Sequence, residues 1–220
     1  MKDSNIPSST LFQRFLGIST EFALWSSSEV EITRKHVNQH TSILDLGCGW
    51  GRFVKKFQPI CKRIVGLDVD FNEIKEAKRY VGDFQNVLLT VQDGRATGFK
   101  CKSFDTIIMM GNVFGNIDNH SRQRILDETV KLITTNGKIL ISAYSDKSTD
   151  FRVKMYKKAG LTINSVSKGK IEFKNSWFSE DFNKIDFLKI VERPQINVIF
   201  HDIDNIGFVA EMSLKSEYRK

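Results

Sequence analysis

The chain has 220 residues, of which 40% are hydrophobic and 27% charged, and only three are proline. This composition fits one globular domain with modest additions and excludes a disordered or proline-rich chain. The formal charge of +7 fits an anionic partner without requiring one. The cysteines Cys48, Cys61 and Cys101 include no CxxC pair, which argues against a disulfide scaffold and a cysteine-rich zinc site.

The pattern of hydrophobicity predicts neither a secretory signal nor a membrane-spanning segment. The first ten residues are polar and lack the apolar core of a secretory signal. The most apolar stretch, residues 104–115, is too short and too broken by glycine to cross a bilayer. We therefore expect a cytoplasmic protein with no membrane partner.

The first 41 residues predict helices that form an N-terminal cap. Apolar side chains recur there at helical spacing. They are Leu11, Phe12, Phe15, Leu16, Phe22 and Trp25.

Residues 42–160 alternate between short apolar runs and amphipathic segments. The runs predict buried strands at 43–46, 64–67, 87–91, 106–110 and 139–143. The amphipathic segments predict helices at 52–57, 72–81 and 120–133, the last ended by Asn136-Gly137. Alternation of this kind predicts βαβ units and a parallel sheet, hence an α/β core.

The last third of the chain changes character. Residues 161–178 predict two strands around a Lys168-Gly169 turn, and residues 179–191 predict a short helix. Two further runs, 197–201 and 208–214, predict a β-hairpin that ends the sheet in an antiparallel pair. We expect one domain with a Rossmann-like, doubly wound, mixed sheet of seven strands. Its parts are the cap (1–41), the core (42–160), an insertion or lid (161–191) and the closing strands (192–220).

A glycine-rich turn follows the first strand, in ILDLGCGWGRF at residues 43–53. Gly47, Gly49 and Gly51 let the backbone turn tightly and approach a ligand, while the next helix offers free N–H donors. Asp45 precedes the turn, and Asp68 ends the second strand, where an acid can hydrogen-bond ribose hydroxyls. These residues indicate an adenosine-type cofactor. A ligand-free tight turn, with Asp68 capping the next helix, remains an alternative.

The set resembles the class I S-adenosylmethionine-dependent methyltransferases, whose three motifs are similar to LDLGCGWGRF, to Asp68 and to Asp93 in VQDGRAT. The resemblance covers residues 40–145 and the terminal hairpin. It implies S-adenosylmethionine as cofactor and S-adenosylhomocysteine as product. It also implies ribose at Asp68, adenine near Asp93 and the methionine ammonium near Asp45, although Asp93-Gly94 also suits a plain turn. The expected cofactor residues are Asp45, Gly47, Cys48, Gly49, Asp68, Val69, Asp93, Gly94, Met110 and Gly111.

The segment after the fourth strand, MMGNVFGNI at 109–117, leaves the sheet where an acceptor should bind. It lacks the Asn-Pro-Pro-Tyr or Asp-Pro-Pro-Tyr of the branches that modify adenine and glutamine amides. It is similar to the segment of glycine and other small-amine N-methyltransferases, which implies a small-molecule acceptor, with an amine nitrogen preferred over oxygen or carbon. The expected catalytic residues are Asn112, His120 and Tyr144, with a turn, an exposed helix start and plain packing as their respective alternatives. We expect no metal.

Two other functions stay open. An RNA methyltransferase would use the basic run Arg52, Lys55, Lys56, Lys62 and Arg63, although such lysines commonly decorate a solvated face. A non-catalytic cofactor-binding partner protein of the same fold is the other.

Aromatic residues of the cap and the insertion suit a lid that excludes water, because the family builds its substrate cover from these regions. They are Phe22, Trp25, Trp177 and Phe178. An aromatic core of the added elements is an equally good interpretation.

Overall fold

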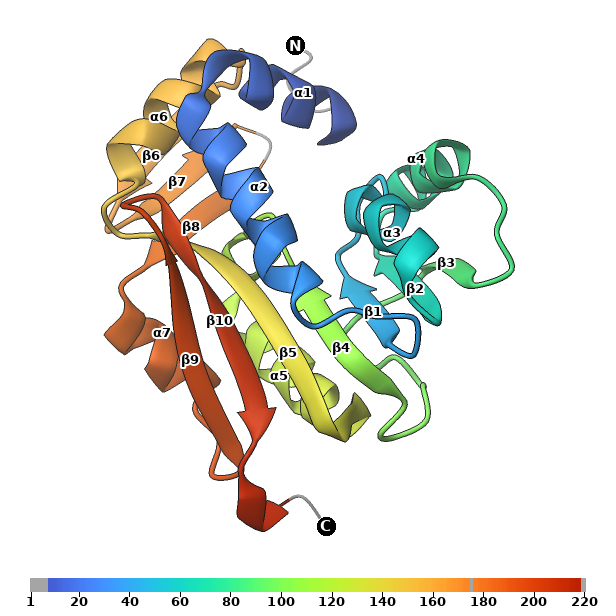
Figure 1. Ribbon diagram of the computed structural model, residues 1–220. Coiled ribbons are helices and arrows are strands. Elements are labelled where there is room, and N and C mark those ends of the chain that lie inside the picture. The colour runs from blue at the N-terminus through green and yellow to red at the C-terminus, as the bar shows by residue number, and fades with distance from the viewer. Residues whose placement is uncertain (1–7, 175, 219–220) are drawn as a thin grey trace.

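A twisted mixed sheet forms the centre of the computed structural model, which describes residues 8–174 and 176–218 (Figure 1). Seven strands follow the spatial order β3-β2-β1-β4-β5-β10-β9. The first five are parallel, and β10 is antiparallel to both β5 and β9. The predicted seven-stranded mixed sheet with a terminal hairpin is confirmed. The strands are β1 (Ser42–Leu46), β2 (Arg63–Asp68), β3 (Val87–Val91), β4 (Phe104–Met109), β5 (Ile133–Ser145), β9 (Ile196–Ile203) and β10 (Gly207–Leu214).

Helices cover both faces of this sheet, as a doubly wound fold requires (Figure 1). Alternate residues of β1 enter opposite cores: Ile43 packs with α2, α3 and α4, and Leu44 packs with α5 and α7. Every residue of β1 is buried, which explains why the apolar residues Ile43, Leu44 and Leu46 do not alternate with solvent-facing polar residues. The helices are α1 (Ser8–Ile18), α2 (Thr20–Arg34), α3 (Arg52–Phe57), α4 (Phe71–Val81), α5 (Asn119–Leu132), α6 (Thr149–Lys158) and α7 (Lys184–Val191), with 3-10 turns η1 (Gln58–Ile60), η2 (Val113–Asn116) and η3 (Ser216–Tyr218).

Three further strands extend the carboxyl end of β5. The hairpin of β6 (Ile163–Ser167) and β7 (Lys170–Phe173) turns at Lys168-Gly169 as predicted. The strand β8 (Phe178–Phe182) pairs with β7 and, through Asp181, with Tyr144 of β5. The helix predicted for residues 179–191 is therefore wrong in its first part. The helix is α7, capped by Asn183, whose side chain accepts from the Asp186 N–H.

The strand β5 begins at Ile133, immediately after α5, so the prediction that Asn136-Gly137 ends a helix is wrong. The register between β4 and β5 shifts near this point, from Phe104 opposite Ile133 to Thr106 opposite Lys138. A side chain at Gly137 would place its Cβ 2.8 Å from the carbonyl oxygen of Asp105. The glycine therefore marks a close backbone approach inside an irregular strand pair.

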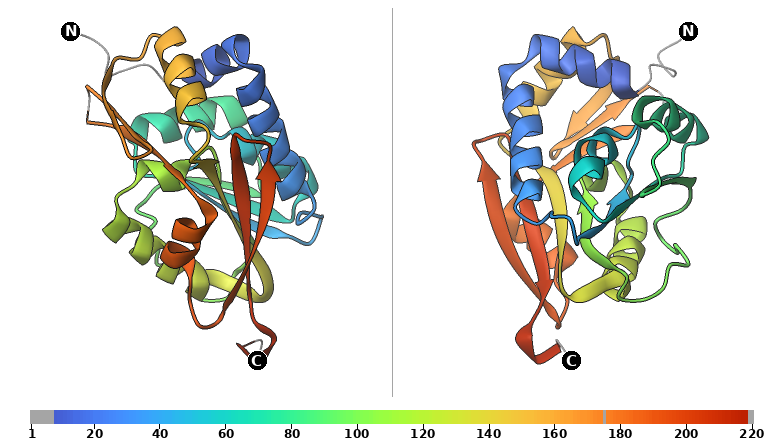
Figure 2. Two further views of the ribbon diagram at one scale, coloured as in Figure 1. Left: turned by 90° about the vertical axis from the view of Figure 1, so that its left-hand side faces the viewer. Right: turned by 45° about the vertical axis from the view of Figure 1, so that its right-hand side comes forward.

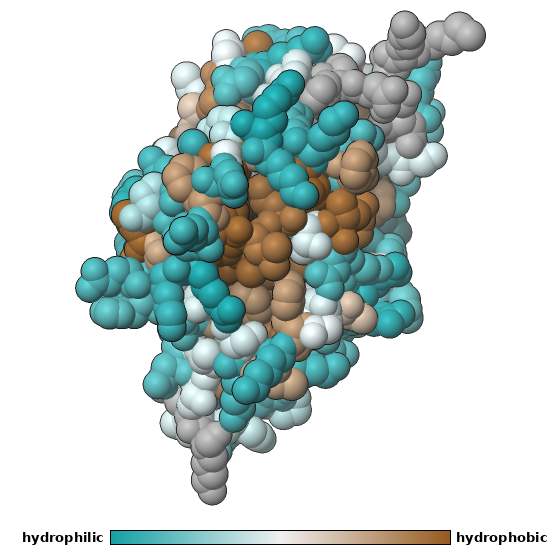
Figure 3. All heavy atoms as spheres, turned by 90° about the vertical axis from the view of Figure 1, so that its right-hand side faces the viewer, coloured by the Kyte–Doolittle hydropathy of each residue, from teal (hydrophilic) through white to brown (hydrophobic). Residues whose placement is uncertain are grey.

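Of the N-terminal helices, α1 lies over the carboxyl ends of the strands, and α2 runs along one face of the sheet. Figure 2 shows α1 beside α6, and the Arg14 guanidinium donates to the Ala159 carbonyl oxygen at 2.9 Å. The side of the molecule formed around α3, α4 and β3, on the right in Figure 1, has a group of apolar side chains surrounded by polar ones (Figure 3). Large exposed apolar residues of this region are Val69, Phe71, Phe84, Leu88 and Val91. In the described part of the chain, no helix has the length and apolarity needed to cross a membrane.

Candidate functional site

The glycine turn after β1 is held in place by Asp68. One carboxylate oxygen of Asp68 accepts from the Gly49 N–H at 2.9 Å, and the other accepts from the Asp70 N–H at 3.0 Å. Burial raises the pKa of Asp68, and these backbone donors oppose that rise. The cap of α4 is Asp70, whose side chain accepts from the Asn72 N–H, so the alternative in which Asp68 caps this helix is wrong.

Asp45 is a buried carboxylate with an unsatisfied oxygen. Its side chain is 2% exposed, and Oδ2 has no hydrogen-bond partner among the described residues. Burial raises the pKa of Asp45 to about 7, although the Arg52 guanidinium opposes the rise. A carboxylate in this state is stabilised by a cation that binds beside it.

A pocket of about 780 Å³ opens at the carboxyl ends of the strands. Three buried side-chain atoms in the described residues lack a hydrogen-bond partner: Asp45 Oδ2, Trp25 Nε1 and Asn116 Oδ1. All three residues line this one pocket. An unsatisfied buried polar atom costs about 1–3 kcal/mol. Their concentration in one cavity therefore indicates a site that a ligand completes.

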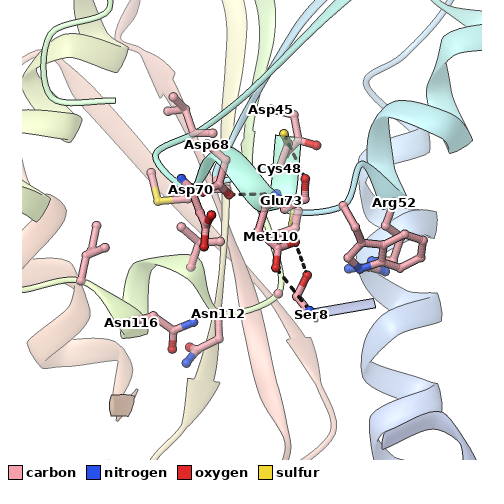
Figure 4. A pocket seen from close by; sticks show the side chains of 18 of the residues that line it. Ser8, Asp45, Cys48, Arg52, Asp68, Asp70, Glu73, Met110, Asn112 and Asn116 are labelled. Carbon is pink, nitrogen blue, oxygen red and sulfur yellow. Dashed lines mark hydrogen bonds between the residues drawn. The ribbon is translucent and has the colours of Figure 1, made fainter. Parts of the chain in front are cut away.

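Figure 4 shows the polar side chains of this pocket. Asp45, Asp68, Asp70 and Glu73 come from β1, β2 and the start of α4, while Asn112 follows β4. Gly111, with φ +69°, has open space where a Cβ would stand, so a side chain there would enter the pocket. All ten expected cofactor residues line the pocket. Their donor set and the cavity volume fit S-adenosylmethionine.

The three expected catalytic residues have different surroundings. Asn112 and Tyr144 line the pocket, whereas His120 is exposed in the first turn of α5 and is not among the lining residues. The Asn112 amide nitrogen donates to Ser179 Oγ and to the Glu180 carbonyl oxygen, both at 3.3 Å. The Asn112 amide oxygen accepts from the Tyr144 N–H at 3.2 Å. Asn112 thus connects the segment after β4 to β5 and to the β8 extension.

Tyr144 is a buried wall of the pocket. Its ring stacks on Trp25 with 4.7 Å between ring centroids. Burial raises the pKa of its hydroxyl well above 10.0, so the phenol stays protonated. Tyr144 offers a ring and a hydroxyl donor at this place, not a phenolate base.

Asp93 is a partly exposed residue of the pocket lining. Its carboxylate accepts from the Arg95 N–H at 2.8 Å and forms an ion pair with the Arg95 guanidinium at 2.5 Å. Hydrogen bonding from the Arg95 side chain lowers the pKa of Asp93. The turn at Asp93-Gly94 that was expected as an alternative is present. The same two residues also line the pocket, so the two interpretations do not exclude each other.

Glu29 is a buried acid of the pocket lining that the sequence interpretation missed. Its carboxylate is fully buried and accepts from the Gly111 N–H, from Ser142 Oγ and from the Arg52 guanidinium, each at 2.6 Å. The signal in the sequence is its position: Trp25, Glu29 and Ile32 share the buried face of α2, where an acid is unusual.

The helix α1 closes part of the pocket. Ser8 donates from its backbone N–H and its hydroxyl to Glu73, and the Ser9 hydroxyl donates to Glu76. Ser8, Phe12 and Phe15 line the pocket below this contact.

Three of the four aromatic residues expected to form a lid also line the pocket: Phe22, Trp25 and Trp177. The fourth, Phe178, is half-buried outside the lining and lies against the Lys170 ammonium. The expected aromatic cover thus forms a wall of the cavity, with Phe178 outside it.

Three residues of the basic run bind other groups of the protein, and of the five only Arg52 is withdrawn from the surface. Arg52 is paired with Glu29, and the Lys55 ammonium donates to the Val81 carbonyl oxygen at 2.8 Å. The Arg63 guanidinium donates to Ser42 Oγ and to the Ser103 carbonyl oxygen. In residues 8–174 and 176–218, no group of three or more His, Cys, Asp or Glu side chains could hold a metal ion.

Comparisons with known proteins agree with this geometry. Residues 43–137 match the family model described as a methyltransferase domain. The chain is 25% identical over 171 residues to the uncharacterized protein MJ1252 of Methanocaldococcus jannaschii, covering 72% of this chain and 63% of that relative. The match therefore spans less than two thirds of the relative.

Two solved structures have a similar fold. The PH0226 protein of Pyrococcus horikoshii has a TM-score of 0.71 at 17% identity, covering 90% of this chain and 93% of that one. An S-adenosylmethionine-dependent methyltransferase of Clostridium acetobutylicum has a TM-score of 0.67 at 13% identity, covering 95% of this chain and 98% of that one.

Proposed function

We propose that this protein is an S-adenosylmethionine-dependent methyltransferase that transfers the methyl group to an amine nitrogen of a small molecule; the match of residues 43–137 to a methyltransferase domain supports the reaction type. The observation that carries the proposal is the shape and charge of the pocket. It continues from the glycine turn into a space walled by α1, α2 and the extension after β5. Such a space suits a small acceptor better than a polymer.

The cofactor supplies an electrophilic methyl group on a sulfonium centre. Asp68 holds the glycine turn and presents its carboxylate for ribose hydroxyls, and Asp45 offers a buried negative charge for the ammonium. The protein's remaining task is to align the acceptor and to exclude water. The hydrogen bonds from α1 to Glu73 and Glu76 support the second task, because they hold α1 over the pocket.

The charge of the lining favours a basic acceptor. The lining contains six carboxylates and two guanidiniums, Arg52 and Arg95, although the whole chain carries +7. Both guanidiniums are already paired with acids. Among the described residues of the lining, a phosphate-rich acceptor would meet excess negative charge and no unpaired cation, which argues against RNA. The carboxylates are Glu29, Asp45, Asp68, Asp70, Glu73 and Asp93.

An amine fits this environment for a second reason. It arrives as an ammonium ion, which carboxylates and aromatic faces attract. It must then lose its proton before it can attack the methyl group. Transfer from water into a largely apolar chamber lowers the pKa of an amine, because burial disfavours its charged form.

The test is a turnover assay with purified protein and S-adenosylmethionine, in which S-adenosylhomocysteine release is measured. Separate reactions contain alkyl- and arylamines, phenols, thiols, carboxylic acids or total RNA. We expect release with amines and a rate that rises with pH as the amine loses its proton. Release with RNA alone, or with phenols alone, would contradict the proposal. Absence of release with every class would favour the non-catalytic alternative.

A further inference from the structure

The part of the pocket that faces away from the glycine turn is an aromatic chamber. Its walls come from α1, α2, β5, α6 and the segment before β8. Three of its rings are buried almost completely: Trp25 (1% exposed), Tyr144 (4%) and Tyr156 (3%). The chamber consists of Phe12, Phe15, Phe22, Trp25, Tyr144, Tyr156 and Trp177.

The rings of this chamber support one another through edge-to-face contacts. Phe22 meets Phe12 at 5.3 Å and Phe15 at 5.1 Å between centroids, and Phe15 meets Tyr156 at 5.6 Å. Because each ring is held by rings from other elements, the wall is a preformed surface of aromatic faces and edges. Such a surface is complementary to another aromatic ring.

Among the described residues that form the chamber, none carries a positive charge for a carboxylate, and the unsatisfied Trp25 Nε1–H is a neutral donor. Two guanidiniums lie against rings of the chamber: that of Arg52, 4.9 Å from the centre of the Phe12 ring and paired with Glu29, and that of Arg152. Arg152 is fully buried 5.2 Å from the centre of the Tyr144 ring, and Asp181 pairs with it. An acceptor with a carboxylate, such as an amino acid, would bury that charge without a cation, which is costly.

We propose that the acceptor is an arylalkylamine: an amine with an aromatic ring, held in the aromatic chamber, and without a carboxylate. This inference rests on the proposed function, because it assumes that the reacting atom is an amine nitrogen. It differs from the glycine-like acceptor that the local resemblance at residues 109–117 implied. The ring gains contact with the preformed wall, and the ammonium gains aromatic faces and the excess carboxylates.

Calorimetry with protein saturated by S-adenosylhomocysteine tests the acceptor class without turnover. The probes are phenethylamine, ethylamine, which lacks the ring, and phenylalanine, which adds the carboxylate. We expect phenethylamine to bind at least about tenfold more tightly than either of the others. Equal binding of ethylamine would overturn the role of the ring. Equal binding of phenylalanine would overturn the exclusion of the carboxylate.

Matched variants at adjacent positions place the ring in the chamber. Trp177→Ala removes a lining ring, whereas Phe178→Ala removes a neighbouring ring outside the lining. We expect Trp177→Ala to weaken phenethylamine binding by about fivefold to tenfold, with unchanged affinity for S-adenosylhomocysteine. Phe178→Ala should change neither affinity. Unchanged phenethylamine binding in Trp177→Ala would overturn the placement. If that variant does not fold, Trp177→Leu is measured in the same way, because it keeps apolar volume and removes the ring.

The failures of the two proposals are distinguishable. A protein that binds phenethylamine as expected but releases S-adenosylhomocysteine only with phenols contradicts the proposed function and, with it, the amine as acceptor; only the chamber as the binding place of an aromatic ring is then supported. A protein that methylates small polar amines but does not bind phenethylamine contradicts this inference alone.

Discussion

Asp68 joins the glycine turn to the start of α4 through two backbone hydrogen bonds, so its carboxylate is oriented before a ligand binds. We expect Asp68→Asn to weaken binding of S-adenosylhomocysteine by about 10-fold to 100-fold, because a hydrogen bond to a charged group contributes about 1.5–3 kcal/mol. Calorimetry measures the change. Asp83→Asn, at an exposed position after α4, is the control and should bind as the unaltered protein does. Equal affinities in all three proteins would contradict the assignment.

Asp45 makes the stability of the ligand-free protein depend on pH. Its pKa is about 7 in the fold, because of burial, against an ordinary value of 3.8. A carboxyl with a raised pKa stabilises the fold fully below the ordinary value, and this contribution is lost as the pH rises through about 7. Asp45→Asn removes the titration. We therefore expect its Tm to exceed that of the unaltered protein above about pH 7, with a smaller difference at about pH 5.

Thermal unfolding across this pH range measures the effect. The same substitution should weaken S-adenosylhomocysteine binding, because the buried negative charge is gone. If the Tm difference between the two proteins is the same at every pH, burial of the Asp45 charge does not destabilise the fold, and the prediction is wrong. Functional residues often lower the stability of the ligand-free fold while they favour binding.

The sequence was sufficient to predict which residues meet at the pocket, because their signals are local. Glycines and acids follow the ends of strands, and the carboxyl ends of parallel strands meet at one edge of a sheet. The surroundings of Asn112 were not predictable in this way. Its partner Ser179 lies 67 residues further along the chain, in an extension whose path the local pattern does not specify.

At the scale of elements, the Glu29–Arg52 ion pair fixes α2 against α3 and the segment after β4. We expect Glu29→Ala to lower the free energy of unfolding by about 3–5 kcal/mol, because it leaves the largely buried Arg52 guanidinium without its acid. The double variant with Arg52→Ala should lose less than the sum of the single variants, by about 1–3 kcal/mol.

Urea unfolding of the four proteins gives this coupling energy. The exposed pair Asp186–Lys189 on α7 is a matched control and should show a coupling below about 1 kcal/mol. Additive losses for Glu29 and Arg52 would mean that the pair contributes nothing specific to the placement of α2.

The helices and strands that were predicted correctly are marked by a hydrophobic pattern in their own sequence. The strand β8 has no such pattern, and most of its residues were predicted as the start of a helix. Its sequence, FSEDF, contains two acids and has weak strand propensity. It forms a strand because Arg152 of α6 pairs with Asp181 and donates to the Ser179 carbonyl oxygen at 3.0 Å. These contacts join residues almost thirty positions apart, so helix and strand could not be distinguished from the local sequence.

At the scale of the whole molecule, the net charge and the charge of the site have opposite signs. The chain carries +7, whereas carboxylates outnumber guanidiniums six to two in the lining of the pocket. Of the basic run near α3, Arg52 faces inward and pairs with Glu29, whereas the other four residues are exposed at the surface. The positive charge of the surface therefore does not extend into the place where methyl transfer is proposed.

This separation predicts how the protein responds to polyanions. RNA bound through six to ten phosphates loses affinity by about 10³-fold to 10⁵-fold between about 50 and 200 mM salt. We expect any retention of RNA on filters to be weak and to follow such a salt dependence, because only the outer surface is basic. Saturating RNA should leave the affinity for S-adenosylhomocysteine unchanged, since the carboxylates of the lining repel phosphate. RNA that competes with S-adenosylhomocysteine or strengthens its binding would instead place nucleic acid at the pocket, and would favour an RNA acceptor over the amine.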